Sequence, residues 1–419
     1  MIKLNFKNPI RLVLVFFVLV FAFSCTGKSD NNAGLNSSAE PTDIVKPEIT
    51  NPPRQGEAVE LTLGTDFNDS AKGIAICDDG GVLLAGKTQT KEKGPYEAYL
   101  VRLDKNNTVL WNKIYGQGDE DGVFAVTQTR DKGFVAAGQT TSAMTKDVNA
   151  YVIKTDSQGN LLWQKSFGGS DKEDAHSLIE LADGNLLFSG YTYSKGEGGD
   201  AYIVKISSKG DMIWEKNYGS ESREDLFSVK ELPNGHIVGI GIGGKNNDIY
   251  AIELDARGNL VQEKYIGDEY MEQGNDIEIA PAGGYFICGF KATNSTNYVY
   301  MYIAKLNKNF EKEWDKIYPG ESFSVAFGAV AEKDGSFTIS GTTKNWGKIQ
   351  NDDGILFNVS AQGETNWEEI FGDEDIEYIN SLEKDAQGYY YMTGYVVHAS
   401  GPRESTYDIN YVKYKHQGE

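Results

Sequence analysis

One pattern of about fifty residues recurs along most of the chain, and this repeat limits the fold more than any other feature. Its clearest part is a strand-like run with a central tryptophan, such as Leu161 to Gly168 around Trp163. The equivalent positions in other copies are Trp111, Trp214, Gln262, Trp314 and Trp367. Neighbouring copies lie 48 to 53 residues apart, and periods of this size are typical of propellers and solenoids.

Three more strand patterns follow each tryptophan run in a fixed order, as in Ala175 to Leu181, Leu186 to Gly190 and Asp200 to Ile206. Each pattern occurs seven times, and the middle one is nearly all apolar and ends at a glycine. Runs that are apolar on both faces need a sheet with neighbours on either side. Four strands repeated seven times therefore predict an all-β fold, a seven-bladed β-propeller over residues 57–416.

The phase of the repeat predicts how the ring closes. The domain begins with a tryptophan-type strand that has Val59 in the tryptophan position, and no such strand follows Asp408 to Tyr414 at the other end. We expect the first strand to complete the last blade by pairing with Asp408 to Tyr414, because this pairing removes an exposed sheet edge.

Residues 1–25 resemble a bacterial lipoprotein signal peptide. Basic residues precede a 13-residue apolar run, Leu12 to Ser24, which is too short to span a bilayer. The run leads into Ala22-Phe23-Ser24-Cys25, which is similar to a lipobox and implies diacylation of Cys25, with palmitate-type chains, and a new N-terminus there. An ordinary secretory signal is the alternative. Ala22 and Phe23 depart from the preferred lipobox residues.

Residues 26–56 predict a disordered tether, because they combine several prolines with Ser, Asn, Asp and Glu and show no apolar periodicity. No aspartate of the kind associated with inner-membrane retention follows Cys25. The lipobox resemblance therefore implies lipid anchoring at the outer membrane or cell surface.

The repeat itself resembles a known family. Gly159 to Gly169, followed by Asp174-Ala175 and Asp183 to Thr192, is similar to the SBBP-type β-propeller repeat of bacterial secreted proteins and lipoproteins. The resemblance covers residues 57–416. It implies the fold and a place in the cell envelope, but that family has no single activity, so the resemblance assigns no chemistry.

Charge and composition exclude several classes of function. The 40 Lys and Arg residues face 61 Asp and Glu, a net charge of −21, which repels nucleic-acid backbones. The four histidines are scattered, and no nucleophile elbow, phosphate loop or Cys-x-x-Cys motif is present. We therefore predict no cofactor, no metal site and no catalytic residue, and expect a monomer. Cys77 and Cys288 are interpreted as buried free thiols.

Recognition is expected on the propeller face that carries the loops between the second and third strands. These connections differ in length, from 9 to 16 residues when counted between equivalent positions, whereas the turns of the opposite face are short and uniform. Aromatic rings among short polar residues suit sugar stacking. The candidate ligand-binding residues are Tyr193, Tyr298, Trp346, His398 and Tyr407. Tyr191 and Tyr395 lie in the same loops, with a core role as the alternative.

The blade-to-blade loops open on that face and are acidic. We interpret Asp121, Asp174, Asp225 and Asp375 as residues that cap backbone N–H groups in a turn needed by every blade. Calcium binding or the steering of cationic ligands are the alternatives.

The sequence thus predicts a binding module whose ligand is a glycan or an envelope protein. The alternative is a carbohydrate-active enzyme, a hydrolase or lyase that uses loop carboxylates, since a catalytic carboxylate pair leaves no sequence signature. A third hypothesis is a scaffold that docks other envelope proteins on its short-turn face.

Overall fold

A computed structural model describes residues 56–196, 198–292, 298–318, 323–344, 352–372, 375–398 and 406–417. These residues form seven four-stranded antiparallel sheets and contain no helix. The predicted all-β seven-bladed propeller is therefore confirmed. Within the same ranges there is no helix that could cross a membrane. Cys25 and Trp346 lie outside the described residues.

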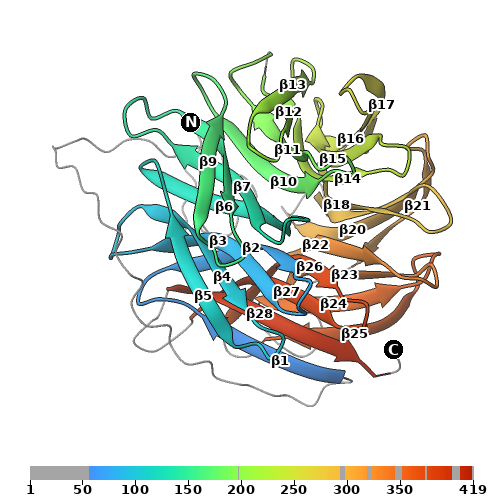
Figure 1. The fold of residues 1–419 in the computed structure, drawn as a ribbon. Coiled ribbons are helices and arrows are strands. Elements are labelled where there is room, and N and C mark those ends of the chain that lie inside the picture. Colours follow the sequence, from blue (N-terminus) through green and yellow to red (C-terminus); the bar gives the residue numbers. More distant parts are fainter. Residues whose placement is uncertain are drawn as a thin grey trace, which may run out of the picture. The chain divides into compact units, whose positions relative to one another are not determined.

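The blades follow one another in chain order (Figure 1). Blade 1 contains β2 (Asp69–Ile76), β3 (Val82–Gln89), β4 (Tyr96–Leu103) and β5 (Val109–Tyr115). Blade 2 contains β6 (Glu120–Gln128), β7 (Phe134–Thr141), β8 (Val148–Thr155) and β9 (Leu161–Phe167). Blade 3 contains β10 (Glu173–Glu180), β11 (Leu186–Thr192), β12 (Asp200–Ile206) and β13 (Met212–Tyr218). Blade 4 contains β14 (Asp225–Glu231), β15 (Ile237–Gly243), β16 (Asp248–Leu254) and β17 (Leu260–Ile266).

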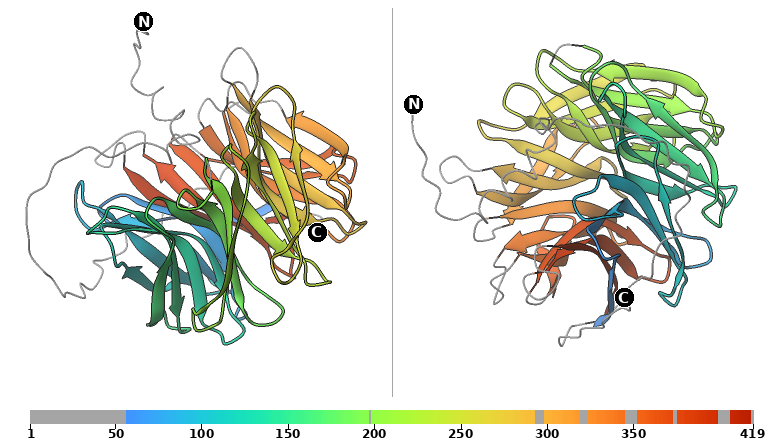
Figure 2. Two further views of the ribbon diagram at one scale, coloured as in Figure 1. Left: turned by 90° about the horizontal axis from the view of Figure 1, so that it is seen from above. Right: turned by 90° about the vertical axis from the view of Figure 1, so that its left-hand side faces the viewer.

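The later blades repeat this arrangement, and Figure 2 shows the ribbon from two further directions. Blade 5 contains β18 (Glu272–Ile279), β19 (Tyr285–Ala292), β20 (Val299–Leu306) and β21 (Lys312–Tyr318). Blade 6 contains β22 (Ser324–Ala331), β23 (Phe337–Lys344), β24 (Asp352–Val359) and β25 (Thr365–Phe371). Blade 7 contains β26 (Ile376–Lys384), β27 (Tyr390–Val397), β28 (Tyr407–His416) and β1 (Gly56–Leu63).

The ring closes through the first strand, as the repeat phase predicts. β1 pairs antiparallel with β28, so that Val59 lies opposite Lys413 and Leu63 opposite Ile409. In Figure 1 the blue strand β1 lies beside the red strand β28. Because the two ends of the domain share one sheet, neither end leaves an unpaired edge within blade 7.

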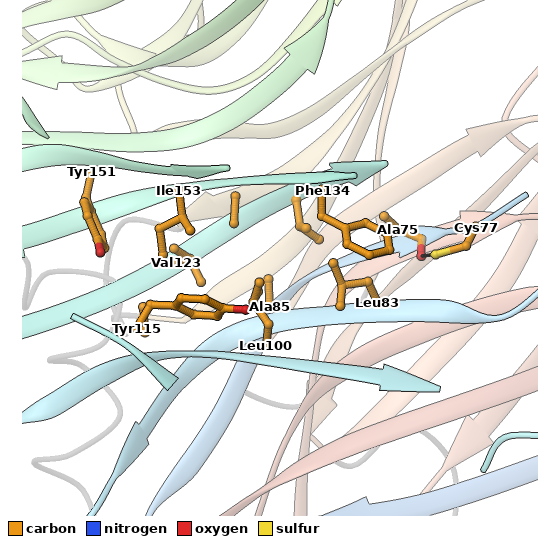
Figure 3. Packing of buried hydrophobic residues seen from close by; sticks show 13 residues of the cluster. Ala75, Cys77, Leu83, Ala85, Leu100, Tyr115, Val123, Phe134, Tyr151 and Ile153 are labelled. Atoms are coloured by element: carbon orange, nitrogen blue, oxygen red, sulfur yellow. Dashed lines mark hydrogen bonds between the residues drawn. The ribbon is translucent and has the colours of Figure 1, made fainter. Parts of the chain in front are cut away.

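Apolar side chains fill the space between adjacent blades. One buried cluster lies at each of the seven blade junctions. At the junction of blades 1 and 2, Tyr115, Phe134 and Tyr151 pack with aliphatic residues and with Cys77 (Figure 3). Cys77 and Cys288 are both buried and free, as predicted.

At four junctions of the outer rim, a tryptophan of one blade contacts a turn of the next. The indole of Trp163 in blade 2 covers Gly210 in a turn of blade 3, and its Nε1 donates a hydrogen bond to Ser208 O at 3.2 Å. Gly210 has φ +78°, and a Cβ there would lie 3.1 Å from the indole. The glycine therefore serves both the turn and the close approach of the ring.

The strand order separates two faces of the propeller. Blade-to-blade loops and second-to-third connections emerge on one side, which we call the loop face, and the remaining turns form the turn face. Turns of the turn face repeat one geometry: Leu181 N donates to Asn185 O, and Ser207 N donates to Asp211 O, both at 2.8 Å.

Candidate binding site at the loop face

The first strand of every sheet is its inner strand, which contacts the inner strands of both neighbouring blades. Each inner strand has a β-bulge at the same position, and a bulge re-aims the residue that it leaves unpaired. The seven bulged residues, which we call the inner wall, are Lys72, Phe124, His176, Phe227, Asn275, Phe327 and Asn380.

Residues of the inner wall contact one another from blade to blade. Lys72 Nζ lies 4.6 Å from the ring centroid of Phe124, and the His176 ring lies 6.3 Å from Phe124 and 5.0 Å from Phe227. In blade 5, Asn275 Nδ2 donates to the Ala326 carbonyl of blade 6 at 2.8 Å. In blades 1 to 4 the bulges therefore bring side chains of separate blades together into one surface.

Two lysines of blade 1 lie at the loop-face end of this surface. In the β2–β3 register Ser70 is opposite Lys87, two residues before the bulged Lys72. Lys87 Nζ lies 4.1 Å from the ring centroid of Tyr96. Burial, reinforced by the nearby Lys87, lowers the pKa of Lys72 to about 8. Burial also lowers the pKa of Lys87, so both ammonium groups are held where their charge is disfavoured.

Blades 3 and 4 add a buried ionic group next to these lysines. Arg223 Nη2 lies 2.8 Å and His176 Nε2 lies 3.4 Å from Asp225 Oδ2. Burial opposes the charge of Asp225, but His176 and Arg223 outweigh it and lower the pKa of that carboxyl. Burial also works against the imidazolium of His176, yet Asp225 and Asp174 together raise its pKa.

Asp174 is fully buried beside this group. Its Oδ1 accepts from Ala175 N at 2.8 Å, while its Oδ2 has no hydrogen-bond partner within the described part of the chain. Burial raises the pKa of Asp174, and His176 and Lys72 act against that rise. An unpartnered buried carboxylate oxygen is costly for the fold, and the inner-wall residues His176 and Lys72 are near enough to favour its charge.

The capping interpretation of the acidic loops is correct for Asp121 and wrong for Asp174 and Asp225. Asp121 Oδ2 accepts from Gln117 N and Gly118 N at 3.0 and 3.1 Å. In blades 3 and 4 the preceding residues cap instead: Glu173 accepts from Gly169 N at 2.7 Å and Glu224 from Ser220 N at 2.9 Å. Because side chains alternate along a strand, a shift of one residue turns Asp174 and Asp225 toward the inner wall.

Tyr193 is the predicted residue that extends the group on blades 3 and 4. Its side chain is 38 % exposed and packs edge-on against Tyr191, with ring centroids 5.4 Å apart. The Arg223 guanidinium lies 5.0 Å over the other ring, that of Tyr191. Tyr191 is only 2 % exposed, so it supports Tyr193 and Arg223 as a core residue.

His398 and Tyr407 lie together in blade 7, where His398 connects two acidic side chains. Its Nδ1 is 2.9 Å from Asp375 Oδ2 and its Nε2 is 2.7 Å from Asp408 Oδ2. Asp375, expected to cap a turn, therefore binds the imidazole. Both ring nitrogens are engaged, which makes His398 an anchor for β27 and β28.

Three tyrosines pack beside this anchor. Tyr407 contacts Tyr395 edge-on at 5.8 Å, and Tyr395 stacks on Tyr378 at 4.6 Å. The backbone N–H of Tyr407 donates to Asn68 Oδ1 in the loop before blade 1 at 3.1 Å. Tyr298 is separate from this group: it contacts Tyr300 of its own blade at 6.4 Å, and no contact joins it to the other candidates among the residues described.

The sequence analysis did not identify the cationic residues Lys72, Lys87 and Arg223, because it considered the aromatic and acidic residues of the loops. The available signal was positional, since an alignment of the seven inner strands puts Lys72 where other copies have Phe, His or Asn. Within the described ranges, no three His, Cys, Asp or Glu residues are arranged to hold a metal ion.

A hollow of about 510 Å³ opens at the turn-face end of blades 1, 2 and 7. Its lining includes Cys77, Gln128, Glu383 and Lys384. Burial raises the pKa of Glu383 to about 7, and Lys384 is paired with Glu332 at 2.7 Å. The hollow has no exposed large apolar residue in its lining, so it offers little surface for a sugar ring.

Comparison with known proteins supports the fold and goes no further. No protein-family model and no curated protein sequence matches the chain. Solved structures do match. Hydrazine synthase of Kuenenia stuttgartiensis has a TM-score of 0.53 at 12 % identity, over 78 % of this chain and 93 % of that one.

Two further likenesses have a TM-score of 0.50 at 10 % identity. One is the Neurospora crassa Pan2 WD40 domain, over 85 % of this chain and 98 % of that one. The other is the polysaccharide lyase Uly1, over 84 % and 91 %. The fold is shared. At such identities the shared fold assigns no activity, and the similar proteins include both enzymes and a WD40 domain.

Proposed function

We propose that this protein is a lipid-anchored binding module of the bacterial cell envelope, of the SBBP repeat type, which holds a glycan at its loop face. One observation carries the proposal: Lys72, Lys87, Arg223 and Tyr193 gather at the loop-face end of blades 1 to 4. The propeller scaffold needs none of them, because other blades fold with different residues at the same positions.

The chemistry of this region supports a saccharide. An exposed tyrosine ring can stack on the apolar face of a pyranose, and charged or amide groups nearby can bind hydroxyls. Tyr193 and Arg223 combine these properties on blades 3 and 4. An envelope protein that presents aromatic and charged side chains to the same face is the other ligand class we propose.

The test uses the soluble domain from Gly56 onward, incubated with a panel of polysaccharides while retention and released oligosaccharides are both recorded. Retention without products is the expected result. Retention of no polysaccharide would contradict the glycan proposal and favour a protein ligand. A parallel fractionation tests the anchor: Cys25→Ser should release the full chain from the membrane fraction, and continued retention would contradict lipidation.

A carbohydrate-active enzyme is the second candidate, favoured by the carboxylate pair Glu97 and Asp121. Both carboxylates flank Gly116, and burial together with Asp121 raises the pKa of Glu97 to about 7, which suits a general acid. A similar pair, Asp200 and Glu224, flanks Gly219 in another blade, and this repetition favours a structural role. Product release that is lost in Glu97→Gln would support the enzyme.

A further inference from the structure

We propose that the loop-face site is specific for acidic saccharides, whose carboxylate binds between Lys72 and Lys87 while a sugar hydroxyl donates to Asp174 Oδ2. This inference rests on the proposed function and names the class of glycan. It assigns a binding role to the lysine pair of blade 1 and to the inner wall, whose residues the scaffold does not require.

The two ammonium groups belong to neighbouring strands of blade 1. Lys72 and Lys87 come from adjacent strands within two residues of the same register position. Lys87 is close enough for its charge to help lower the pKa of Lys72. A monovalent anion placed between two such groups gains from both, and a carboxylate can accept hydrogen bonds on both of its oxygens.

Both lysines of blade 1 contact aromatic rings. Each ammonium group lies over an aromatic ring: Phe124 at 4.6 Å from Lys72 Nζ and Tyr96 at 4.1 Å from Lys87 Nζ. No carboxylate of the described residues forms an ion pair with Lys87, although Glu120 and Asp174 act on it at longer range. A ring attracts an ammonium group only weakly compared with a hydrogen-bonded carboxylate, so a ligand carboxylate improves on the ring contact of Lys87.

Asp174 lets the site distinguish a sugar acid from a simple anion. Its buried Oδ2 lacks a hydrogen-bond donor among the described residues, and its charge acts on Lys72, Lys87 and His176. A carboxylate ion alone would be repelled by Asp174 and could not donate to it. A uronic acid carries the required acceptor and donor on one ring, since its carboxylate reaches the lysines and its hydroxyls can donate to Asp174.

The other blades lack this pair of basic residues. The residues paired at the position of Lys87 in blades 2 to 7 are Gln139, Tyr191, Ile242, Phe290, Thr342 and Tyr395. None is cationic, and apart from His176 no other bulged position has a basic residue. A basic pair in a chain of net charge −21 is therefore a local feature of blade 1, where it attracts anions against the average field.

The experiment compares polymers that differ only in the carboxylate. Polygalacturonate, alginate and hyaluronate are each matched with their carboxyl-reduced neutral form, and binding to the soluble domain is measured at low and high salt. We expect at least one acid to bind about tenfold more tightly than its neutral form, the strength of one charge-assisted hydrogen bond. Salt should weaken the acidic form alone.

Variants locate the site. Lys87→Gln and Lys72→Gln should each reduce acid binding by about tenfold, whereas Lys91→Gln, an exposed lysine in the next loop of the same blade, should change it less than about twofold. Melting curves identify any variant that fails to fold, and Lys87→Arg, which keeps the charge, should retain binding.

The outcomes separate the two proposals. Equal or better binding of the neutral polymers overturns the acidic specificity and leaves the glycan-binding function standing. Acid binding that survives in both glutamine variants overturns the lysine site. Failure of every polysaccharide to bind overturns both proposals.

Discussion

The outer rim and the inner wall of the propeller follow opposite rules. At the rim one contact recurs at four blade junctions: the indole of one blade covers a turn glycine of the next so closely that a Cβ on the glycine would lie 2.8 to 3.2 Å from the ring. These pairs are Trp111 with Gly159, Trp163 with Gly210, Trp214 with Gly258 and Trp314 with Gly363. At the inner wall the bulge recurs in every blade, but its residue changes from Lys to Phe, His and Asn.

One of the exceptions at the rim shows why its residues repeat. Between blades 4 and 5 the tryptophan is replaced by Gln262 and the turn glycine by Phe310, which keeps the turn conformation at φ +57°. Gln262 Nε2 still donates to the next blade, to Lys308 O at 2.8 Å, and the buried Phe310 ring packs on Tyr285. Rim positions change together because they share one space, whereas inner-wall positions change without altering the scaffold.

The largest effect is expected where the rim closes. Deleting Gly56 to Leu63 removes β1, which leaves one edge of β28 without a partner strand and removes Leu61 and Leu63 from their buried cluster. We expect loss of cooperative unfolding or a fall of many degrees in the melting temperature, measured by calorimetry. Deleting only residues before Gly56 is the control. An unchanged melting curve for the longer deletion would contradict closure by β1.

Between blades 4 and 5, Gln262 stands in place of tryptophan and Phe310 in place of glycine. We expect the effects of substitutions at these two positions on stability to be coupled. Gln262→Trp should cost about 2 kcal/mol because an indole would overpack against Phe310. Phe310→Gly should cost about 3 kcal/mol because it empties a buried space.

The double variant should be more stable than the sum of these costs, by at least about 1 kcal/mol in a denaturant-based mutant cycle, because the indole then covers a glycine as in the other blades. Additive costs would show that the two positions do not share one space.

A smaller effect is expected from pH at the blade 7 and blade 1 junction. Burial, with a contribution from Asp408, raises the pKa of Asp69 to about 6. The folded state therefore keeps a proton that the unfolded state loses, so this group makes the protein less stable as pH rises from about 4 to about 6, by about 2 to 3 kcal/mol.

Asp69→Asn should remove this fall in stability with pH, when unfolding free energies are compared from about pH 4 to about pH 7, because asparagine does not titrate. The turn should be kept, since the amide oxygen can still accept from Thr65 N. Asp66→Asn, in the exposed loop nearby, is the control. The same slope in the Asp69→Asn variant and the wild-type protein would contradict the raised pKa.

The smallest effect on stability is expected at the inner wall. Lys87→Gln removes a charge that burial disfavours, so the free energy of unfolding should change by less than about 1 kcal/mol. Trp163→Ala at the rim should cost about 3 kcal/mol. Equal losses in equilibrium denaturation would remove the distinction between scaffold and binding residues.

Sequence periodicity predicted the blade number, the strand order and the closing strand, because every blade buries the same pattern of side chains. It could not predict the inner wall, since the capping position, three residues before the bulge, is occupied by Asp121 in blade 2 but by Glu173 in blade 3, and the sequence does not show where the bulge lies. The contacts of His398 with Asp375 and Asp408 also depend on strands far apart in sequence, which no local pattern reveals.

Ligand binding at the loop-face end of the inner wall is open to a direct test by hydrogen–deuterium exchange. The domain is compared alone and with a saturating acidic oligosaccharide. We expect slower exchange at the loop-face ends of β2, β3, β10 and β14, and no change at the turns around Gly184 and Gly210. Protection confined to those turns or to the outer strands would show that the ligand binds elsewhere.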